Sequence, residues 1–67
     1  MRVHIEFYAP DDLDIKLTPE QATLYRRWVD AGGITWSSEW HEFYYSIQDE
    51  VRDHMFDHRN IDSVVEM

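Results

Sequence analysis

The chain has no cysteine, no long apolar run and few basic residues, and each absence excludes a class of protein. Without cysteine, neither a disulfide nor a thiolate metal site can stabilise the fold. No stretch approaches the roughly 18 apolar residues of a membrane-spanning helix, and the N-terminal segment lacks the apolar core of a signal peptide. We therefore expect a cytoplasmic protein that makes no contact with a membrane.

Basic residues are scarce and dispersed, with six of them against 14 acidic residues and a net charge of -8. A protein that binds phosphates needs a clustered basic patch that displaces counterions. Here the adjacent pair Arg26 and Arg27 is the one small cluster, and its simplest role is solubility. The composition argues against direct binding of nucleic acid. The natural partner of so acidic a chain is a basic surface.

Apolar and aromatic residues are plentiful, at 43% and 15% of the 67 positions. Such a composition predicts one compact domain over residues 1–67 rather than a disordered chain. Domains of this size bury a modest fraction of their surface and are marginally stable alone. Either dense aromatic packing or self-association must supply the missing stability, so a monomer and a homodimer both remain open.

Residues 2–17 have the pattern of a β-hairpin. In both RVHIEFY and LDIKL every second residue is apolar, which is the period of a strand with one buried face. The intervening APDD predicts the turn between the two strands.

The segment TPEQ predicts the start of a helix over residues 19–31. Thr18 is the expected N-cap, Pro19 suits the first helical position, and Gln21 completes a capping box. Gly32 and Gly33 predict its end. The face expected to cover the sheet carries Gln21, Leu24, Tyr25, Trp28 and Val29.

A second amphipathic helix is predicted over residues 38–58, projected at about 100° per residue. Its expected core face carries Trp40, Phe43, Tyr44, Ile47, Val51, His54, Met55 and His58. The following IDSVVEM is rich in β-branched residues and can add a third strand or pack as an irregular end. The predicted fold class is therefore α+β, a small single domain with an N-terminal hairpin, two helices and this optional C-terminal strand.

The acidic residues of the second helix are all predicted on one arc, opposite the core. They are Glu39, Glu42, Asp49, Glu50, Asp53 and Asp57. Like charges four residues apart, such as Asp49 and Asp53, destabilise a helix, so folding alone does not explain the arrangement. Six charges over about 27 Å of helix give one per roughly 4.5 Å, against about 3.4 Å along a DNA strand. The stripe is thus predicted to bind a basic, nucleic-acid-binding protein.

Two aromatic residues, Tyr45 and Phe56, flank this predicted stripe off the core face. Exposed aromatic rings beside charges are typical interface anchors. The alternative is that the acids are an ordinary solvated face, with both rings covered by the C-terminal tail or the first helix.

Signatures of catalysis are absent from the sequence, which contains no Ser-His-Asp pattern and no glycine-rich phosphate loop. His54 and His58 have the spacing of a helical metal pair, to which Asp57 or His4 could add a ligand. Both histidines project onto the apolar face, where a hydrogen-bonded histidine is commoner than a metal ligand. We expect no enzyme activity, no cofactor and no bound metal.

Small size, high negative charge, lack of cysteine and one-sided acids together resemble the small acidic proteins that phages and mobile elements use against host defence. That class includes DNA mimics that block CRISPR or restriction complexes. The resemblance implies an inhibitor in the host cytoplasm, with a CRISPR complex as first target and a restriction enzyme as second. The alternative is a small regulatory, adaptor or antitoxin-like subunit that binds a protein through the aromatic edge.

Overall fold

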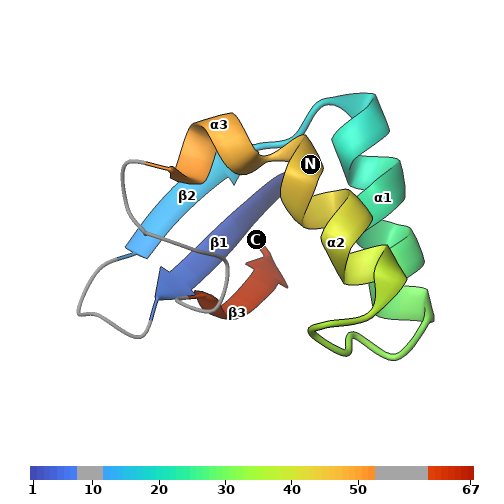
Figure 1. Ribbon diagram of the computed structural model, residues 1–67. Helices are drawn as coiled ribbons and strands as arrows, with labels where there is room; N and C mark the ends of the chain where they lie inside the picture. The colour runs from blue at the N-terminus through green and yellow to red at the C-terminus, as the bar shows by residue number, and fades with distance from the viewer. Residues whose placement is uncertain (8–11, 53–60) are drawn as a thin grey trace.

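The computed structural model describes residues 1–7, 12–52 and 61–67, which form a three-stranded sheet and three helices (Figure 1). The elements are β1 (Arg2–Phe7), β2 (Asp12–Lys16), α1 (Pro19–Asp30), α2 (Ser38–Ser46), α3 (Gln48–Val51) and β3 (Ile61–Glu66). The predicted α+β class is confirmed, as are its N-terminal hairpin and its C-terminal strand.

The sheet is antiparallel throughout, in the order β2-β1-β3. Ile5 of β1 lies opposite Leu13 on one side and Val64 on the other, so apolar residues of all three strands share one face. The helices cover that face, so Val3 and Ile5 have no exposed surface. The other face carries the exposed residues Glu6, Asp12 and Asp14, and it is called the open face below.

The start of α1 is the capping box that the sequence predicts. The backbone N–H of Gln21 donates to Thr18 Oγ1 at 3.2 Å, and the Thr18 N–H donates to Gln21 Oε1 at 2.9 Å. The helix ends at Asp30, and the glycines that follow take positive φ values of 110° and 64°. The predicted buried face is confirmed at Tyr25 and Trp28 but is wrong at Val29, which is 46% exposed.

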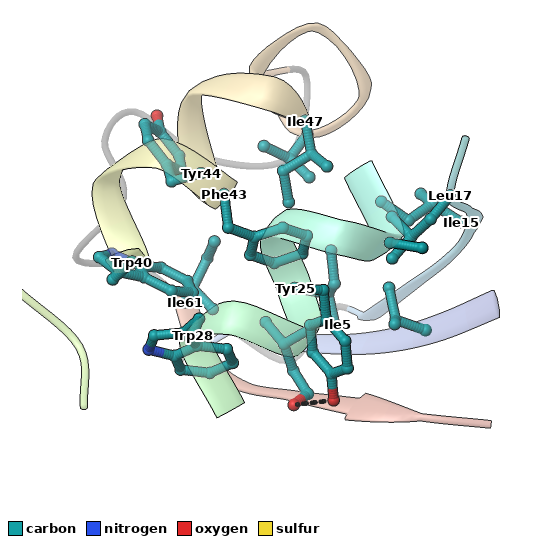
Figure 2. Packing of buried hydrophobic residues seen from close by; sticks show 14 of the residues in the cluster. Ile5, Ile15, Leu17, Tyr25, Trp28, Trp40, Phe43, Tyr44, Ile47 and Ile61 are labelled. Atoms are coloured by element: carbon teal, nitrogen blue, oxygen red, sulfur yellow. Dashed lines mark hydrogen bonds between the residues drawn. The ribbon is translucent and has the colours of Figure 1, made fainter. Parts of the chain in front are cut away.

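Aromatic rings fill the space between the helices and the sheet (Figure 2). The ring centroids of Trp28 and Trp40 are 5.0 Å apart, and those of Tyr25 and Phe43 are 5.3 Å apart. The Tyr25 hydroxyl also donates to the carbonyl of Val64 at 3.5 Å, which ties α1 to β3. These tilted ring pairs contribute stability beyond their buried area, in a chain that has no cysteine for a disulfide.

The prediction of one continuous helix over 38–58 is wrong within the described residues, because the helix is interrupted at Ile47. The Ser46 carbonyl accepts the side-chain amide of Gln21 at 2.6 Å. The Glu50 N–H, which would reach that carbonyl in a continuous α-helix, donates instead to Ile47 O at 3.0 Å. A bond from α1 therefore occupies the position where the helical ladder would continue.

The Ser46 hydroxyl contributes to the same break by donating to Phe43 O at 2.6 Å. Ile47 N–H then bonds Tyr44 O at 3.1 Å, the tighter spacing of a 3₁₀ turn. The core face still follows the prediction as far as it is described, because Trp40, Phe43, Tyr44, Ile47 and Val51 are all buried. The remaining predicted core residues, His54, Met55 and His58, lie outside the described residues.

The Gln21→Ala variant tests this junction. It leaves the Ser46 carbonyl and the Thr18 N–H without their side-chain partners, and the former lies in a partly buried position. We expect a loss of about 1–3 kcal/mol in the free energy of unfolding, measured by urea denaturation.

The matched control is Thr23→Ala, which removes an exposed hydroxyl bonded to Pro19 O on the same helix. This variant should lose less than about 0.5 kcal/mol. Equal losses in the two variants would contradict a special role for Gln21.

Candidate interaction surface

The break at Ile47 divides the predicted acidic stripe. Glu39 and Glu42 lie on α2, whereas Asp49 and Glu50 lie on α3, which does not continue the line of α2 (Figure 1). Asp53 and Asp57 lie outside the described residues. The comparison with the charge spacing of DNA assumed one straight helix, so it does not hold for the four described acids.

All four of these acids contact side chains of their own chain, and in three of them the partner lies three or more positions away in the sequence. Glu42 Oε2 pairs with Arg27 at 3.2 Å, Asp49 Oδ1 lies 3.9 Å from Arg52, and Glu50 Oε1 accepts from Gln21 at 3.3 Å. Exposed pairs of this kind stabilise a fold only weakly.

Arg27 therefore forms an ion pair with Glu42 of its own chain. The fourth acid, Glu39, accepts a hydrogen bond from the neighbouring Ser38 hydroxyl at 3.3 Å.

An aromatic row runs along α2 and into the loop before it, and it is exposed at Trp36 and Tyr45 and half-buried at His41. It consists of Trp36, His41 and Tyr45. His41 and Tyr45 are four residues apart on the helix and stack with ring centroids 6.1 Å apart, while Trp36 meets His41 edge-on at 6.4 Å. Tyr45 is 64% exposed, so the prediction that it lies off the core is confirmed. Phe56 lies outside the described residues.

Trp36 has an unusual backbone conformation, with a φ of 76°. This left-handed conformation costs a non-glycine residue on the order of 1–3 kcal/mol. Because Trp36 is 55% exposed, burial of its ring offsets little of that cost. The segment 34–36 contains no strand and turns at Thr35 and Trp36. Strained residues are enriched at ligand-binding sites, and sequence reasoning missed Trp36 because no residue pattern predicts a left-handed tryptophan.

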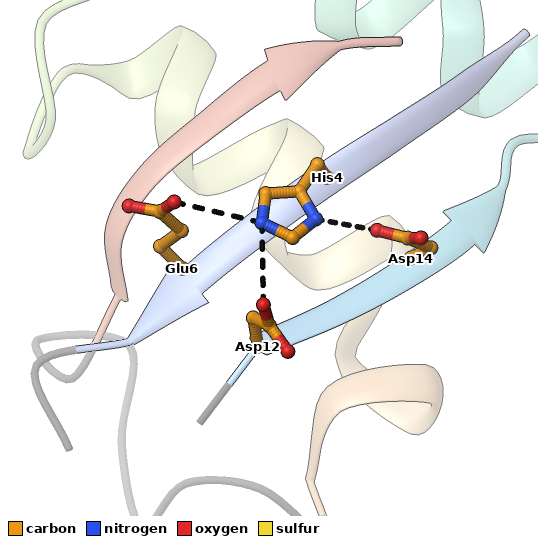
Figure 3. Close-up of polar contacts among 4 residues, drawn as sticks. All are labelled: His4, Glu6, Asp12 and Asp14. Carbon is orange, nitrogen blue, oxygen red and sulfur yellow. Dashed lines mark hydrogen bonds and ion pairs between the residues drawn. The ribbon is translucent and has the colours of Figure 1, made fainter. Parts of the chain in front are cut away.

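A second polar cluster lies on the open face of the sheet, around His4 (Figure 3). The Nδ1 atom of His4 donates to Asp14 Oδ1 at 2.5 Å. The Nε2 atom of His4 lies 3.6 Å from both Glu6 Oε1 and Asp12 Oδ2. The hairpin register creates this cluster, because it sets His4 opposite Asp14 and Glu6 opposite Asp12. The alternation predicted for both strands places their polar residues on one outward face, and this pattern was the sequence signal for the His4 cluster.

The hydrogen bond to Asp14 raises the pKa of His4 above its ordinary value of 6.5, although partial desolvation opposes the shift. The negative charges of Asp14, Asp12 and Glu6 act in the same direction as the hydrogen bond. The imidazolium form is thus favoured in the folded protein. It offsets part of the repulsion among three carboxylates that two neighbouring strands bring together.

No group of three or more potential ligands that could hold a metal ion occurs in the parts of the chain that the structure describes. His54 and His58, the helical pair considered from the sequence, lie outside those parts. Among the described helices, none has the length and apolar character needed to cross a membrane.

Comparisons of the chain with protein-family models, with curated proteins and with solved structures find no match. Geometry and charge are therefore the basis for a functional proposal.

Protonation of His4 should make stability depend on pH. Because the folded-state pKa is raised, the stabilisation by His4 is fully present below about pH 6.5 and is lost as the pH rises through the raised value. We expect the wild type to exceed His4→Gln in free energy of unfolding near pH 6, measured by urea denaturation. The two proteins should converge at alkaline pH, and a difference that stays constant with pH would contradict the role of the imidazolium.

Proposed function

We propose that this chain is a non-enzymatic inhibitor that binds the basic, nucleic-acid-binding surface of a host defence complex in the cytoplasm. The contact region is the α2 surface, which we define as Trp36, Glu39, His41, Glu42 and Tyr45. One observation carries the proposal. The carboxylates Glu39 and Glu42 share α2 with the exposed ring of Tyr45, and the exposed ring of Trp36 lies just before the helix, with Tyr45 64% and Trp36 55% exposed.

This combination matches the two kinds of contact that proteins make with single-stranded nucleic acid. Their Lys and Arg side chains bind phosphates, and their aromatic or guanidinium groups stack on bases. On the α2 surface, Glu39 and Glu42 can take the place of phosphates, while the rings of Trp36 and Tyr45 can take the place of bases. A merely solvated helix face has no need of the two exposed rings.

The net charge of -8 supports the same class of partner, since it steers the chain toward basic surfaces. The choice of a defence complex rests on the resemblance in size, charge and lack of cysteine. A CRISPR effector is the first candidate target on that basis, and a restriction enzyme is the second. Partner binding by Asp53, Asp57 and Phe56 remains a prediction.

A second candidate function is that of a regulatory or adaptor subunit, antitoxin-like in its mode of binding, that uses the aromatic row. The strained backbone of Trp36 favours it, because an exposed ring held in a costly conformation indicates a positioned contact. Binding of this kind would persist at high salt. It would weaken when Trp36 or Tyr45 is replaced by alanine.

The proposal predicts that the purified chain inhibits target-DNA binding by a Cascade-type or Cas9-type effector. Inhibition should be stoichiometric and should weaken with added salt, because it rests on charge. The double variant Glu39→Lys with Glu42→Lys should require at least about tenfold more protein for half-inhibition, since it reverses the charge of both carboxylates on the α2 surface. Gel-shift titration measures the effect.

The matched control is Glu20→Lys with Asp30→Lys, which changes the net charge equally but on α1. This control should inhibit within about twofold of the wild type if position matters more than total charge. Equal loss in both double variants would contradict a specific α2 surface. Absence of inhibition for either effector would remove the CRISPR target, and binding that resists salt but fails with Trp36→Ala would favour the adaptor function.

A further inference from the structure

A cavity of about 180 Å³ opens at the end of the molecule where α1, α2 and β3 meet. Its walls are Trp28, Gly33, Thr35, Trp40 and the first four residues of β3, 61–64. Drug-sized ligands occupy about 300–1,000 Å³, whereas a cavity of about 150 Å³ holds one benzene. This cavity therefore fits the head group of a single side chain rather than a nucleotide.

The walls have the chemistry of a cation site. Two indoles, Trp28 and Trp40, form an apolar floor with ring centroids 5.0 Å apart, and they are 6% and 1% exposed. Asp62 adds a carboxylate and Thr35 adds a hydroxyl, and no basic residue lines the cavity among the residues that the structure describes. The ring of Trp28 is also held in place, because its Nε1 donates to Ile34 O at 2.9 Å. Figure 2 shows the two indoles side by side, with Ile61 next to them.

A β-bulge brings Asp62 to this site. In the pairing of β1 with β3, Glu6 lies opposite Ser63 but Phe7 lies opposite Ile61, so Asp62 is an extra residue with no partner across the ladder. Bulges redirect side chains and are common beside functional sites. In a regular strand successive residues alternate between faces, whereas here four consecutive residues contribute to one cavity wall.

We infer that this cavity binds the guanidinium group of an arginine side chain. Arginine fits better than lysine because its planar, weakly hydrated head group can lie flat on an apolar floor while it donates two parallel hydrogen bonds to the carboxylate of Asp62. The inference rests on the proposed function for the source of the arginine, which is the basic surface of the partner. Thr35 and Trp40, which line the cavity, are the chain neighbours of Trp36 and His41 of the α2 surface.

The test uses the whole chain and small probes, followed by NMR signals of the three tryptophan indole N–H groups. N-acetyl-arginine methylamide should shift the Trp28 and Trp40 signals in a saturable manner. Trp36 does not line the cavity and serves as an internal reference whose signal should stay in place. The matched probe is N-acetyl-citrulline methylamide, which has nearly the same shape without the charge and should not saturate.

Substitution at the bulge tests the carboxylate. Asp62→Asn should weaken binding of the arginine probe about fivefold or more, because a charge-assisted contact becomes a neutral one. Asp30→Asn removes the same charge from an exposed position on α1 and should leave the affinity unchanged. An unchanged backbone amide spectrum verifies that each variant is folded.

Three outcomes would overturn the inference. These are equal binding of the citrulline probe, equal binding of N-acetyl-lysine methylamide, or unchanged affinity in Asp62→Asn. The result is independent of effector inhibition, since the Glu39→Lys, Glu42→Lys variant should still bind the arginine probe. Failure of effector inhibition with intact probe binding would remove the proposed function alone, whereas failure of probe binding with intact inhibition would remove the cavity from the mechanism.

Discussion

The side-chain amide of Gln21 joins the three helices of this small domain. Its oxygen accepts the Thr18 N–H and closes the cap of α1, while its nitrogen donates to the Ser46 carbonyl and to Glu50. A largely buried amide must satisfy both its donor and acceptor atoms, so this position fixes where α2 ends as firmly as where α1 begins. The division of the acidic residues between α2 and α3 follows from it.

The aromatic core complements this polar junction. In a chain of 67 residues without cysteine, tilted contacts among Tyr25, Trp28, Trp40 and Phe43 provide the rigid packing that a disulfide provides elsewhere. The core also shapes the cavity beside β3, because two of its largely buried indoles, Trp28 and Trp40, line that cavity. The same rings thus support the fold and the inferred arginine site.

Negative charge is distributed over two surfaces, and its surroundings differ between them. On the open sheet face, Glu6, Asp12 and Asp14 surround His4. The positive charge of the protonated His4 offsets part of the negative charge of these carboxylates. Along α2, carboxylates lie next to exposed rings. Total charge indicates a basic partner, whereas the pairing of acids with rings distinguishes the α2 surface as the proposed contact region.

Local sequence determined the hairpin, the capping box of α1 and the buried face of α2, because strand alternation, caps and helical periodicity act over a few residues. It also placed Tyr45 outside the core. Tertiary contacts decided the rest. The break at Ile47 required Gln21 to approach Ser46, the His4 cluster required strand register, and the cavity required the bulge at Asp62. Partners brought together by folding lie far apart in the sequence, so no local pattern specifies them.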